Sequence, residues 1–240
     1  MKGTIMKSVL ITGGSRGIGK ACVKLFSQNG WRVFFTYVKN EACAKQTADE
    51  CGAVMIKCDV SKKQDVEKLG STIEQYGVAL DCIVNNAGIA EQILFVDITE
   101  QQWDRMFDVN IKGMYFTTKQ FISKMINRHS GSIVNISSVW GLGGGSCEVH
   151  YAASKAAVIG FTRALADEMG PSGIRVNCVA PGVIDTDMNG HLSADDMDEL
   201  KNETPLLSVG TPEQVAATVY FLADSESFIT GEVIKVSGGF

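Results

Sequence analysis

Tyr151 and Lys155 are the residues of this 240-residue chain whose types and spacing best suit proton transfer. They open a run of strong helix formers, so their side chains are expected one turn apart on the same face of a helix. A tyrosine titrates near ~10, and a fixed positive charge nearby favours the phenolate and lowers that pKa. Such a phenol can donate and accept a proton near neutral pH. Tyr-x-x-x-Lys is also a short and common pattern, so the pair alone could equally lie on an inert, exposed helix face.

A glycine-rich segment from Thr12 to Gly19 lies between an apolar run and a helical pattern. Glycines let the backbone turn tightly and approach a ligand, and the N–H groups at a helix start bind phosphate. In this strand–turn–helix position the segment predicts dinucleotide binding. NAD enzymes usually carry an acid at the end of the second strand, ~20 residues further on. Residues 36–40 hold no acid and Arg16 lies in the loop, which favours the 2′-phosphate of NADPH; a solvated Arg16 with loose selectivity is the alternative.

Short apolar runs alternate with helical patterns along the whole chain. The expected strands cover residues 9–12, 33–37, 54–57, 82–85, 132–136, 176–179 and 233–236. The expected helices cover residues 18–28, 41–50, 61–76, 99–126, 151–166, 194–202 and 212–222. Ser61 and Gln64 have the spacing of a capping box for the third helix. Because the strands are apolar throughout, we expect an α/β fold in which helices cover both faces of a parallel sheet, in a single domain spanning residues 1–240.

The composition excludes several classes of function. A net charge of −5 without a long basic run disfavours nucleic acid as a partner. Apolar segments stay short of the ~18–20 residues that cross a bilayer, so no membrane association is expected. Seven cysteines without a Cys-x-x-Cys pair predict reduced thiols in the cytoplasm, and neither they nor the histidines have the spacing of a metal site.

Residues 183–210 depart from the alternating pattern, because they have few apolar anchors and carry an acidic cluster around residues 195–199. They form either a solvated surface helix or a mobile flap over a substrate site.

In order and spacing, the motifs resemble those of the short-chain dehydrogenase/reductase family over essentially the whole chain. The resemblance rests on the glycine loop, Asn85 to Gly88 after the fourth strand, Asn110, Ser138, the Tyr151/Lys155 pair, and Pro181-Gly182 after the sixth strand. It implies a Rossmann-type, doubly wound, mainly seven-stranded parallel sheet. It also implies an NADPH-dependent oxidoreductase that reduces a ketone to an alcohol.

The resemblance assigns catalytic roles to Asn110, Ser138, Tyr151 and Lys155. Ser138 would polarise the substrate carbonyl, Tyr151 would protonate its oxygen, and Asn110 would hold a water on the path to solvent. Lys155 would lower the tyrosine pKa and hold the nicotinamide ribose. The implied cofactor-binding residues are Gly13, Ser15, Arg16, Gly17, Ile18, Gly19, Asp59, Val60, Asn86, Ala87, Gly88, Tyr151, Lys155, Pro181, Gly182, Ile184 and Thr186. Asp59 could instead cap a helix.

Within the family the chain is most similar to the 3-oxoacyl-acyl-carrier-protein reductases of fatty acid biosynthesis, which form homotetramers. The segment before Tyr151 departs from their pattern, because Glu148 and His150 place charge and a titratable ring beside the site. We therefore expect these two residues, with Ser138 and Tyr151, to contact substrate. Arg128 and His129 match one of the two basic places at which these reductases dock their acidic carrier, and the second place lacks its basic residue.

Three other functions stay open. Reduction of elongation factor P modified with 5-aminopentanone would suit Glu148, because a carboxylate favours a cationic amino-ketone. A sugar or polyol dehydrogenase is a further alternative. A non-enzymatic, dinucleotide-sensing regulator would not need Tyr151 and Lys155, and their presence disfavours it.

Overall fold

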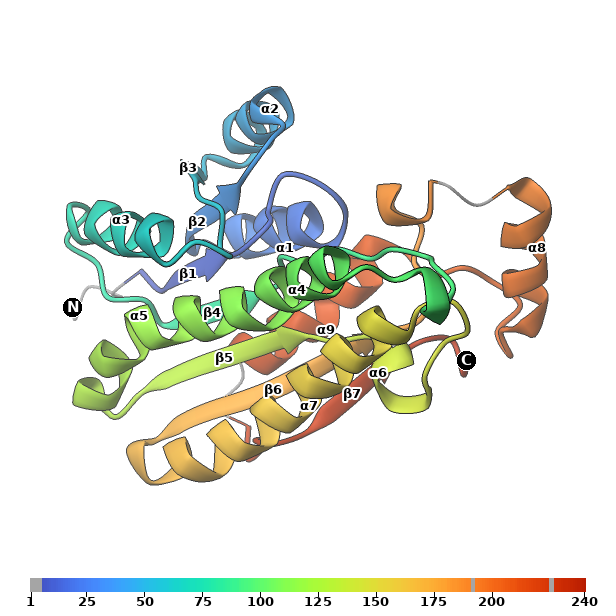
Figure 1. The fold of residues 1–240 in the computed structure, drawn as a ribbon. Coiled ribbons are helices and arrows are strands. Elements are labelled where there is room, and N and C mark those ends of the chain that lie inside the picture. The colour runs from blue at the N-terminus through green and yellow to red at the C-terminus, as the bar shows by residue number, and fades with distance from the viewer. Residues whose placement is uncertain (1–5, 191–192, 225–226) are drawn as a thin grey trace.

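A parallel sheet in the order β3-β2-β1-β4-β5-β6-β7 forms the centre of the molecule (Figure 1). The computed structural model describes residues 6–190, 193–224 and 227–240. The strands are β1 (Ser8–Ile11), β2 (Arg32–Tyr37), β3 (Val54–Lys57), β4 (Cys82–Asn85), β5 (Gly131–Ile136), β6 (Ile174–Pro181) and β7 (Val233–Val236). Every expected strand is present, and the predicted Rossmann-type parallel sheet is confirmed.

Helices cover both faces of this sheet. They are α1 (Gly17–Gln28), α2 (Glu41–Cys51), α3 (Lys63–Glu74), α4 (Glu100–Phe107), α5 (Gly113–Arg128), α6 (Trp140–Gly143), α7 (Val149–Met169), α8 (Ala194–Glu203) and α9 (Pro212–Asp224). Four short turns of helix accompany them: η1 (Phe95–Asp97), η2 (Asp108–Lys112), η3 (Gly170–Ser172) and η4 (Asp187–Asn189). Among the described residues no helix is long and apolar enough to span a membrane.

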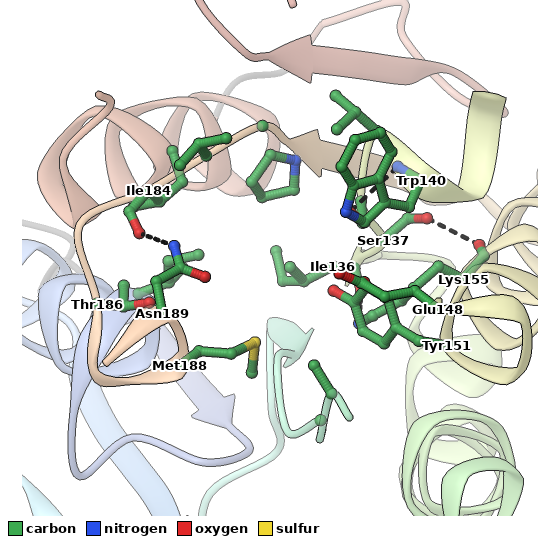
Figure 2. A pocket seen from close by; sticks show the side chains of 18 of the residues that line it. Ile136, Ser137, Trp140, Glu148, Tyr151, Lys155, Ile184, Thr186, Met188 and Asn189 are labelled. Carbon is green, nitrogen blue, oxygen red and sulfur yellow. Dashed lines mark hydrogen bonds between the residues drawn. The ribbon is translucent and has the colours of Figure 1, made fainter. Parts of the chain in front are cut away.

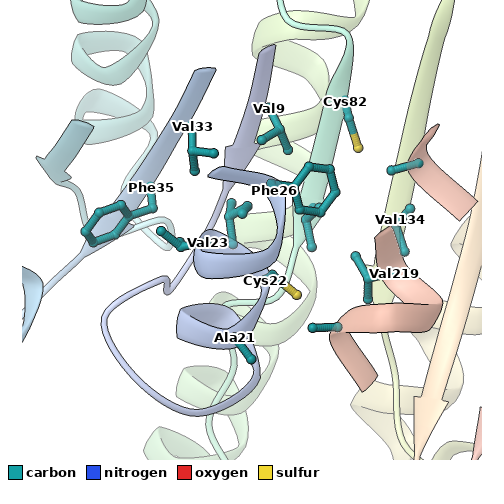
Figure 3. Close-up of a cluster of buried hydrophobic side chains, with 14 of the residues drawn as sticks. Val9, Ala21, Cys22, Val23, Phe26, Val33, Phe35, Cys82, Val134 and Val219 are labelled. Carbon is teal, nitrogen blue, oxygen red and sulfur yellow. The ribbon is translucent and has the colours of Figure 1, made fainter. Parts of the chain in front are cut away.

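Successive residues of each strand enter two different cores, as the two-residue period of a strand requires. Val9 and Ile11 of β1 pack with α1 and α9 on one face (Figure 3), whereas Leu10 packs with α3 and α5 on the other. Both faces of β1 are therefore buried, which explains its uninterrupted apolar sequence.

The order of the strands reverses between β1 and β4, which pair in parallel although β2 and β3 separate them in sequence. Loops leave the carboxyl ends of neighbouring strands in opposite directions at such a point and open a crevice there. The glycine loop after β1 and the Asn86–Gly88 segment after β4 both begin at this crevice.

The structure corrects two local predictions. The expected helix over residues 99–126 is two helices, α4 and α5, joined by the single π-helical turn η2 that contains Asn110. The expected capping box at Ser61 does not form, because the Ser61 hydroxyl donates to Asp59 at 2.7 Å instead, and α3 begins at Lys63.

Candidate active site

The glycine loop is packed too tightly for side chains. Gly17 has φ +52°, a conformation that non-glycine residues rarely adopt. A Cβ at Gly19 would collide with the carbonyl oxygen of Gly13, so α1 can approach the loop closely only because residue 19 is glycine. Within the described residues no side chain caps the first turn of α1. Its N–H groups and the positive end of the helix dipole thus suit a phosphate, and the loop fits the expected dinucleotide.

Asn86 and Thr12 fix the loop to the end of β4. The Asn86 amide donates to the carbonyls of Thr12 at 2.9 Å and Gly13 at 3.1 Å. The Thr12 hydroxyl accepts from the backbone N–H groups of Asn86 and Ala87 at 3.0 and 2.9 Å. The segment expected to lie against the cofactor therefore also holds the phosphate loop in place.

Arg16 lies on the outside of the loop, with its side chain 70% exposed and 3.6 Å from Asp187 of η4. An exposed ion pair of this kind contributes little to stability. The guanidinium is consequently available to an anionic group of a bound cofactor.

Asp59 and Val60 follow β3, which the two strands β2 and β1 separate from β4 in the sheet. The Asp59 carboxylate accepts from the Ser61 hydroxyl and lies 3.7 Å from Lys62, so it stabilises the turn that leads into α3. Val60 is buried against Gly113 of α5. Both residues shape the end of β3, where the resemblance places the adenine.

Ser138 and Tyr151 lie together at the carboxyl end of β5. Both side chains are buried, and both line the same cavity. Burial raises the pKa of Tyr151 to about 12; the hydrogen bond from Ser138 acts in the opposite direction, and the charge of Glu148 raises the pKa further. The expected low pKa of Tyr151 is therefore corrected: desolvation has the largest effect, and Tyr151 is a protonated phenol at neutral pH.

Lys155 is buried on α7, and its ammonium donates to the carbonyl oxygen of Ile136 at 2.9 Å. It lies 5.6 Å from the centroid of the Tyr151 ring. Burial lowers the pKa of Lys155 to about 8, so its charge is lost in mildly alkaline solution.

Asn110 links three segments around the site. Its amide donates to Ser154 of α7 at 2.9 Å and to the carbonyl of Ile89 at 3.0 Å, and its oxygen accepts from the Ile89 N–H at 2.9 Å. The π-helical turn η2 makes room for this geometry, because it displaces Asn110 from the ordinary helical path.

A cavity of about 210 Å³ lies beside Ser138, Tyr151 and Lys155 (Figure 2), and Asn110, Arg16, Asp59 and Val60 lie outside its lining. Its lining includes the expected site residues Ile18, Asn86, Gly88, Ser138, Glu148, Tyr151, Lys155, Pro181, Gly182, Ile184 and Thr186. Residues from five parts of the chain thus surround one space, with Tyr151 on one wall and Ile184 and Thr186 on the opposite wall.

His150 is not part of this lining. Its side chain is completely buried, its ring lies 3.7 Å from the carboxylate of Glu91, and no hydrogen bond to either ring nitrogen is formed by the described residues. On a helix, consecutive side chains point about 100° apart, so Tyr151 faces the cavity while His150 faces the protein interior. The expected contact of His150 with substrate is therefore not supported by its position.

The structure adds cavity residues that the sequence did not single out, among them Ala90, Gln92, Met188, Asn189 and Leu200. Leu200 belongs to α8, so the segment 183–210 contributes to the cavity wall; its residues 191 and 192 lie outside the described residues. Leu200 is one of two large apolar residues, with Met197, in this polar helix, and that pattern was the available signal for the contact. No sequence signal indicated Gln92, because its place depends on a hydrogen bond of 2.7 Å from the N–H of Ile93 to the carbonyl of Cys147, which is distant in sequence.

Comparison with known proteins agrees with this geometry. A family model described as Enoyl-(Acyl carrier protein) reductase matches residues 13–240. The 3-oxoacyl-[acyl-carrier-protein] reductase of Chlamydia muridarum is 42% identical over 246 residues, covering 98% of this chain and 97% of the relative. The reductase of the same name from Aquifex aeolicus is 38% identical, covering 97% and 96%.

A crystal structure of the 3-oxoacyl-[acyl-carrier protein] reductase from Brucella melitensis superposes with a TM-score of 0.91 and 37% identity, covering 98% of this chain and 91% of the other. Fold, motif order and full-length similarity thus coincide. The chain belongs to the short-chain dehydrogenase/reductase family of nicotinamide dinucleotide-dependent enzymes, and it is an oxidoreductase that acts on a ketone or alcohol group.

Proposed function

We propose that this enzyme reduces 3-oxoacyl thioesters of acyl carrier protein to 3-hydroxyacyl thioesters with NADPH. One observation carries the proposal: the hydroxyl-bearing side chains of Ser138 and Tyr151 line the same cavity as Gly88, beside the glycine loop. Two hydroxyl donors at one point suit a carbonyl oxygen on which negative charge develops. The names and full-length similarity of the relatives support the choice of substrate.

When bound, NADPH supplies a hydride to the keto carbon. Ser138 and Tyr151 then stabilise the oxygen, and the phenol of Tyr151 transfers its proton to it. A pKa of about 12 keeps this phenol protonated before the reaction, which favours reduction at neutral pH. The ammonium of Lys155, 5.6 Å from the ring centroid, favours the phenolate that remains.

The choice of NADPH rests on Arg16 and on the end of β2. Tyr37 ends β2 with no carboxylate in residues 36–40 to bind a ribose 2′-hydroxyl. Arg16 presents an exposed guanidinium at the edge of the glycine loop, and arginine binds phosphate through paired charge-assisted hydrogen bonds. The loop, Arg16 and the Asn86–Gly88 segment would together hold the dinucleotide.

Steady-state assays with purified enzyme test the proposal. We expect NADPH oxidation with acetoacetyl-acyl carrier protein, with a lower KM than for acetoacetyl-coenzyme A. NADH at the same concentration should be used much less efficiently. Absence of turnover with both thioesters would contradict the proposed substrate, and equal use of NADH would contradict the proposed cofactor preference.

Arg128, at the basic place expected to dock the carrier, makes contacts within its own chain. Its guanidinium donates to the backbone carbonyls of Ala79 and Leu80 at 3.0 and 2.5 Å, and it lies 3.5 Å from Asp81. These contacts tie the end of α5 to the segment before β4, at the edge of the sheet opposite the site. Comparing KM for acetoacetyl-acyl carrier protein with KM for acetoacetyl-coenzyme A therefore measures how much the carrier contributes to substrate binding.

A second candidate is a ketone that carries an ammonium group, as in elongation factor P modified with 5-aminopentanone. Glu148 and Trp140 both line the cavity (Figure 2), and a carboxylate near an aromatic ring attracts a cation. A Glu148→Gln variant separates the two functions. It should leave thioester reduction within about twofold for the first candidate, because the thioester brings no cation to this carboxylate, and should lose most activity on an amino-ketone for the second.

We further propose that the enzyme acts in the cytoplasm as a homotetramer. All seven cysteines are free thiols in the structure, as a reducing compartment requires. Trp103 of α4 and Tyr115 of α5 are 36% and 40% exposed, and burial of such aromatic side chains between subunits would be favourable. Light scattering coupled to size-exclusion chromatography tests the assembly, and a monomeric mass would contradict it.

A further inference from the structure

Four buried polar side chains form a continuous row beneath the active site. The amide nitrogen of Asn85 donates to the hydroxyl of Thr118 at 3.1 Å and to the side-chain oxygen of Asn135 at 2.8 Å. The amide nitrogen of Asn135 in turn donates to the hydroxyl of Thr162 at 2.9 Å. Asn135 and Thr162 are inaccessible to solvent, and Asn85 and Thr118 are no more than 6% exposed.

Each member of this row belongs to an element that carries part of the site. Asn85 ends β4 and precedes Gly88, and Asn135 lies on β5 before Ser138. The two asparagines are direct neighbours in the sheet. The row therefore connects the two strands whose carboxyl ends open into the cavity.

The threonines extend the row to the two helices above these strands (Figure 1). Thr118 lies on α5, which continues from the turn that contains Asn110. Thr162 lies on α7, seven positions after Lys155, so two turns of helix place them on the same face. One chain of three hydrogen bonds thus spans the elements that hold Asn110, Ser138, Tyr151 and Lys155.

Stability alone does not account for this row. Buried amides lose their hydration, and their hydrogen bonds contribute only about 1 kcal/mol each in compensation. The side-chain oxygen of Asn85 even lacks a hydrogen-bond partner among the described residues. Apolar side chains of similar volume would fill the same space without that cost. Directional hydrogen bonds, unlike apolar contacts, restrict how a helix slides over a sheet.

We propose that Thr118, Asn85, Asn135 and Thr162 are positioning residues that set the helices α5 and α7 against β4 and β5 for catalysis. Their effect reaches the site through the next residue of β5, since the carbonyl of Ile136 accepts from Lys155 at 2.9 Å. A shift of α7 along β5 would lengthen this bond and separate the phenol of Tyr151 from Ser138. The measurements of kcat that test this proposal rest on the proposed ketone reduction.

Valine substitutions at three buried threonines provide the test. Thr162→Val and Thr118→Val keep the shape of the side chain and remove its hydroxyl. Thr117→Val is the matched control, because Thr117 is equally buried on α5 and, among the described residues, its hydroxyl bonds only to Gly113 of its own helix, at 2.9 Å. Thr162 makes the same kind of bond to Val158, so the control subtracts its loss. Thr162→Ser restores the hydroxyl without the methyl group.

We expect kcat for the acetoacetyl thioester to fall about tenfold in Thr162→Val and Thr118→Val, because misplacement of reacting groups by a fraction of an ångström lowers the rate steeply. The KM for NADPH should change by less than about twofold, since the glycine loop is not part of the row. Thr162→Ser and Thr117→Val should retain kcat within about twofold. Equal loss of kcat in Thr117→Val, or wild-type kcat in both Thr162→Val and Thr118→Val, would overturn the proposal.

Hydrogen exchange supplies a readout that needs no substrate. In Thr162→Val the amides of residues 149–156 should exchange about tenfold faster than in the wild type, because α7 is less firmly attached to β5. Thr117→Val should not accelerate them. If the wild-type enzyme reduced no thioester, the proposed substrate would be wrong. The exchange comparison would still test whether the four residues position α7. Unchanged exchange in Thr162→Val would overturn the proposal.

Discussion

Lys155 donates a hydrogen bond of 2.9 Å to the backbone carbonyl oxygen of Ile136, the last residue of β5. The lysine that we propose to favour the Tyr151 phenolate is thus attached to the strand that leads directly to Ser138. Because the ammonium is buried with this one carbonyl rather than with a carboxylate, desolvation lowers the pKa of Lys155 to about 8. The charge that we propose to assist proton transfer therefore titrates near physiological pH.

The pH dependence of the reaction follows from this shift. Below a pH of about 8 Lys155 carries its charge and favours the phenolate left after proton transfer; above it the charge is lost. We expect kcat for reduction to fall as the pH rises through about 8, with saturating NADPH at every pH. Tyr151 does not produce this decline, because its pKa is about 12.

A Lys155→Met variant serves as the control for the pH profile. It should be slow at all pH values and should lack the alkaline decline. A wild-type profile that stays flat well above pH 8 would contradict the shift at Lys155.

Tyr151→Phe removes the proton donor while it keeps the ring. We expect kcat/KM to fall at least about 10²-fold, the usual contribution of a positioned acid. The ring fills the same buried space, so thermal unfolding and NADPH binding, followed by nucleotide fluorescence, should stay close to the wild type. Retention of activity would show that another group protonates the substrate.

Arg16→Gln tests cofactor selection. Loss of the guanidinium should raise the KM for NADPH about tenfold or more, the value of a charge-assisted hydrogen bond to phosphate, and leave the KM for NADH nearly unchanged. Lys20→Gln is the matched control, because Lys20 lies one turn further along α1 and pairs with Glu50 at 3.1 Å. Equal changes for both nucleotides in Arg16→Gln would mean that Arg16 does not recognise the 2′-phosphate.

Local sequence patterns were sufficient to predict the strands and most of the helices. Apolar runs such as residues 82–84 are buried on both faces, so their sequence and their environment agree. The break between α4 and α5 was not predictable in this way. It depends on the bonds of Asn110 to Ile89 and Ser154, which lie 21 and 44 residues away in sequence.

The order of the motifs also identified the groups that meet in the cavity, but not their electrostatics. A charge four residues away suggested a low pKa for Tyr151, whereas the depth of burial, which no short pattern reveals, makes it high. His150 illustrates the same limit. Its position next to Tyr151 suggested a substrate contact, and only the direction of α7 shows that it faces the interior instead.

Gly88→Ala tests how closely the catalytic groups are packed. A Cβ at Gly88 would lie 3.2 Å from the Asn110 side-chain oxygen and 3.4 Å from the Lys155 ammonium. Hydrogen bonds hold both groups, so neither can yield without losing its partner. We expect overpacking to lower the free energy of unfolding, measured by urea denaturation, by about 1–3 kcal/mol. The value of kcat should fall, and the KM for NADPH should change less.

Gly160→Ala is the control for that substitution. Gly160 lies on α7, and its added methyl group would meet none of the described residues within 4 Å. Since alanine favours a helix over glycine, this variant should be more stable by up to about 1 kcal/mol and keep its kcat. If Gly88→Ala matched the Gly160→Ala control in kcat, the space above Gly88 would have no part in positioning Asn110 and Lys155. A selective loss of kcat in Gly88→Ala would show that the two groups act only at the spacing that a glycine permits.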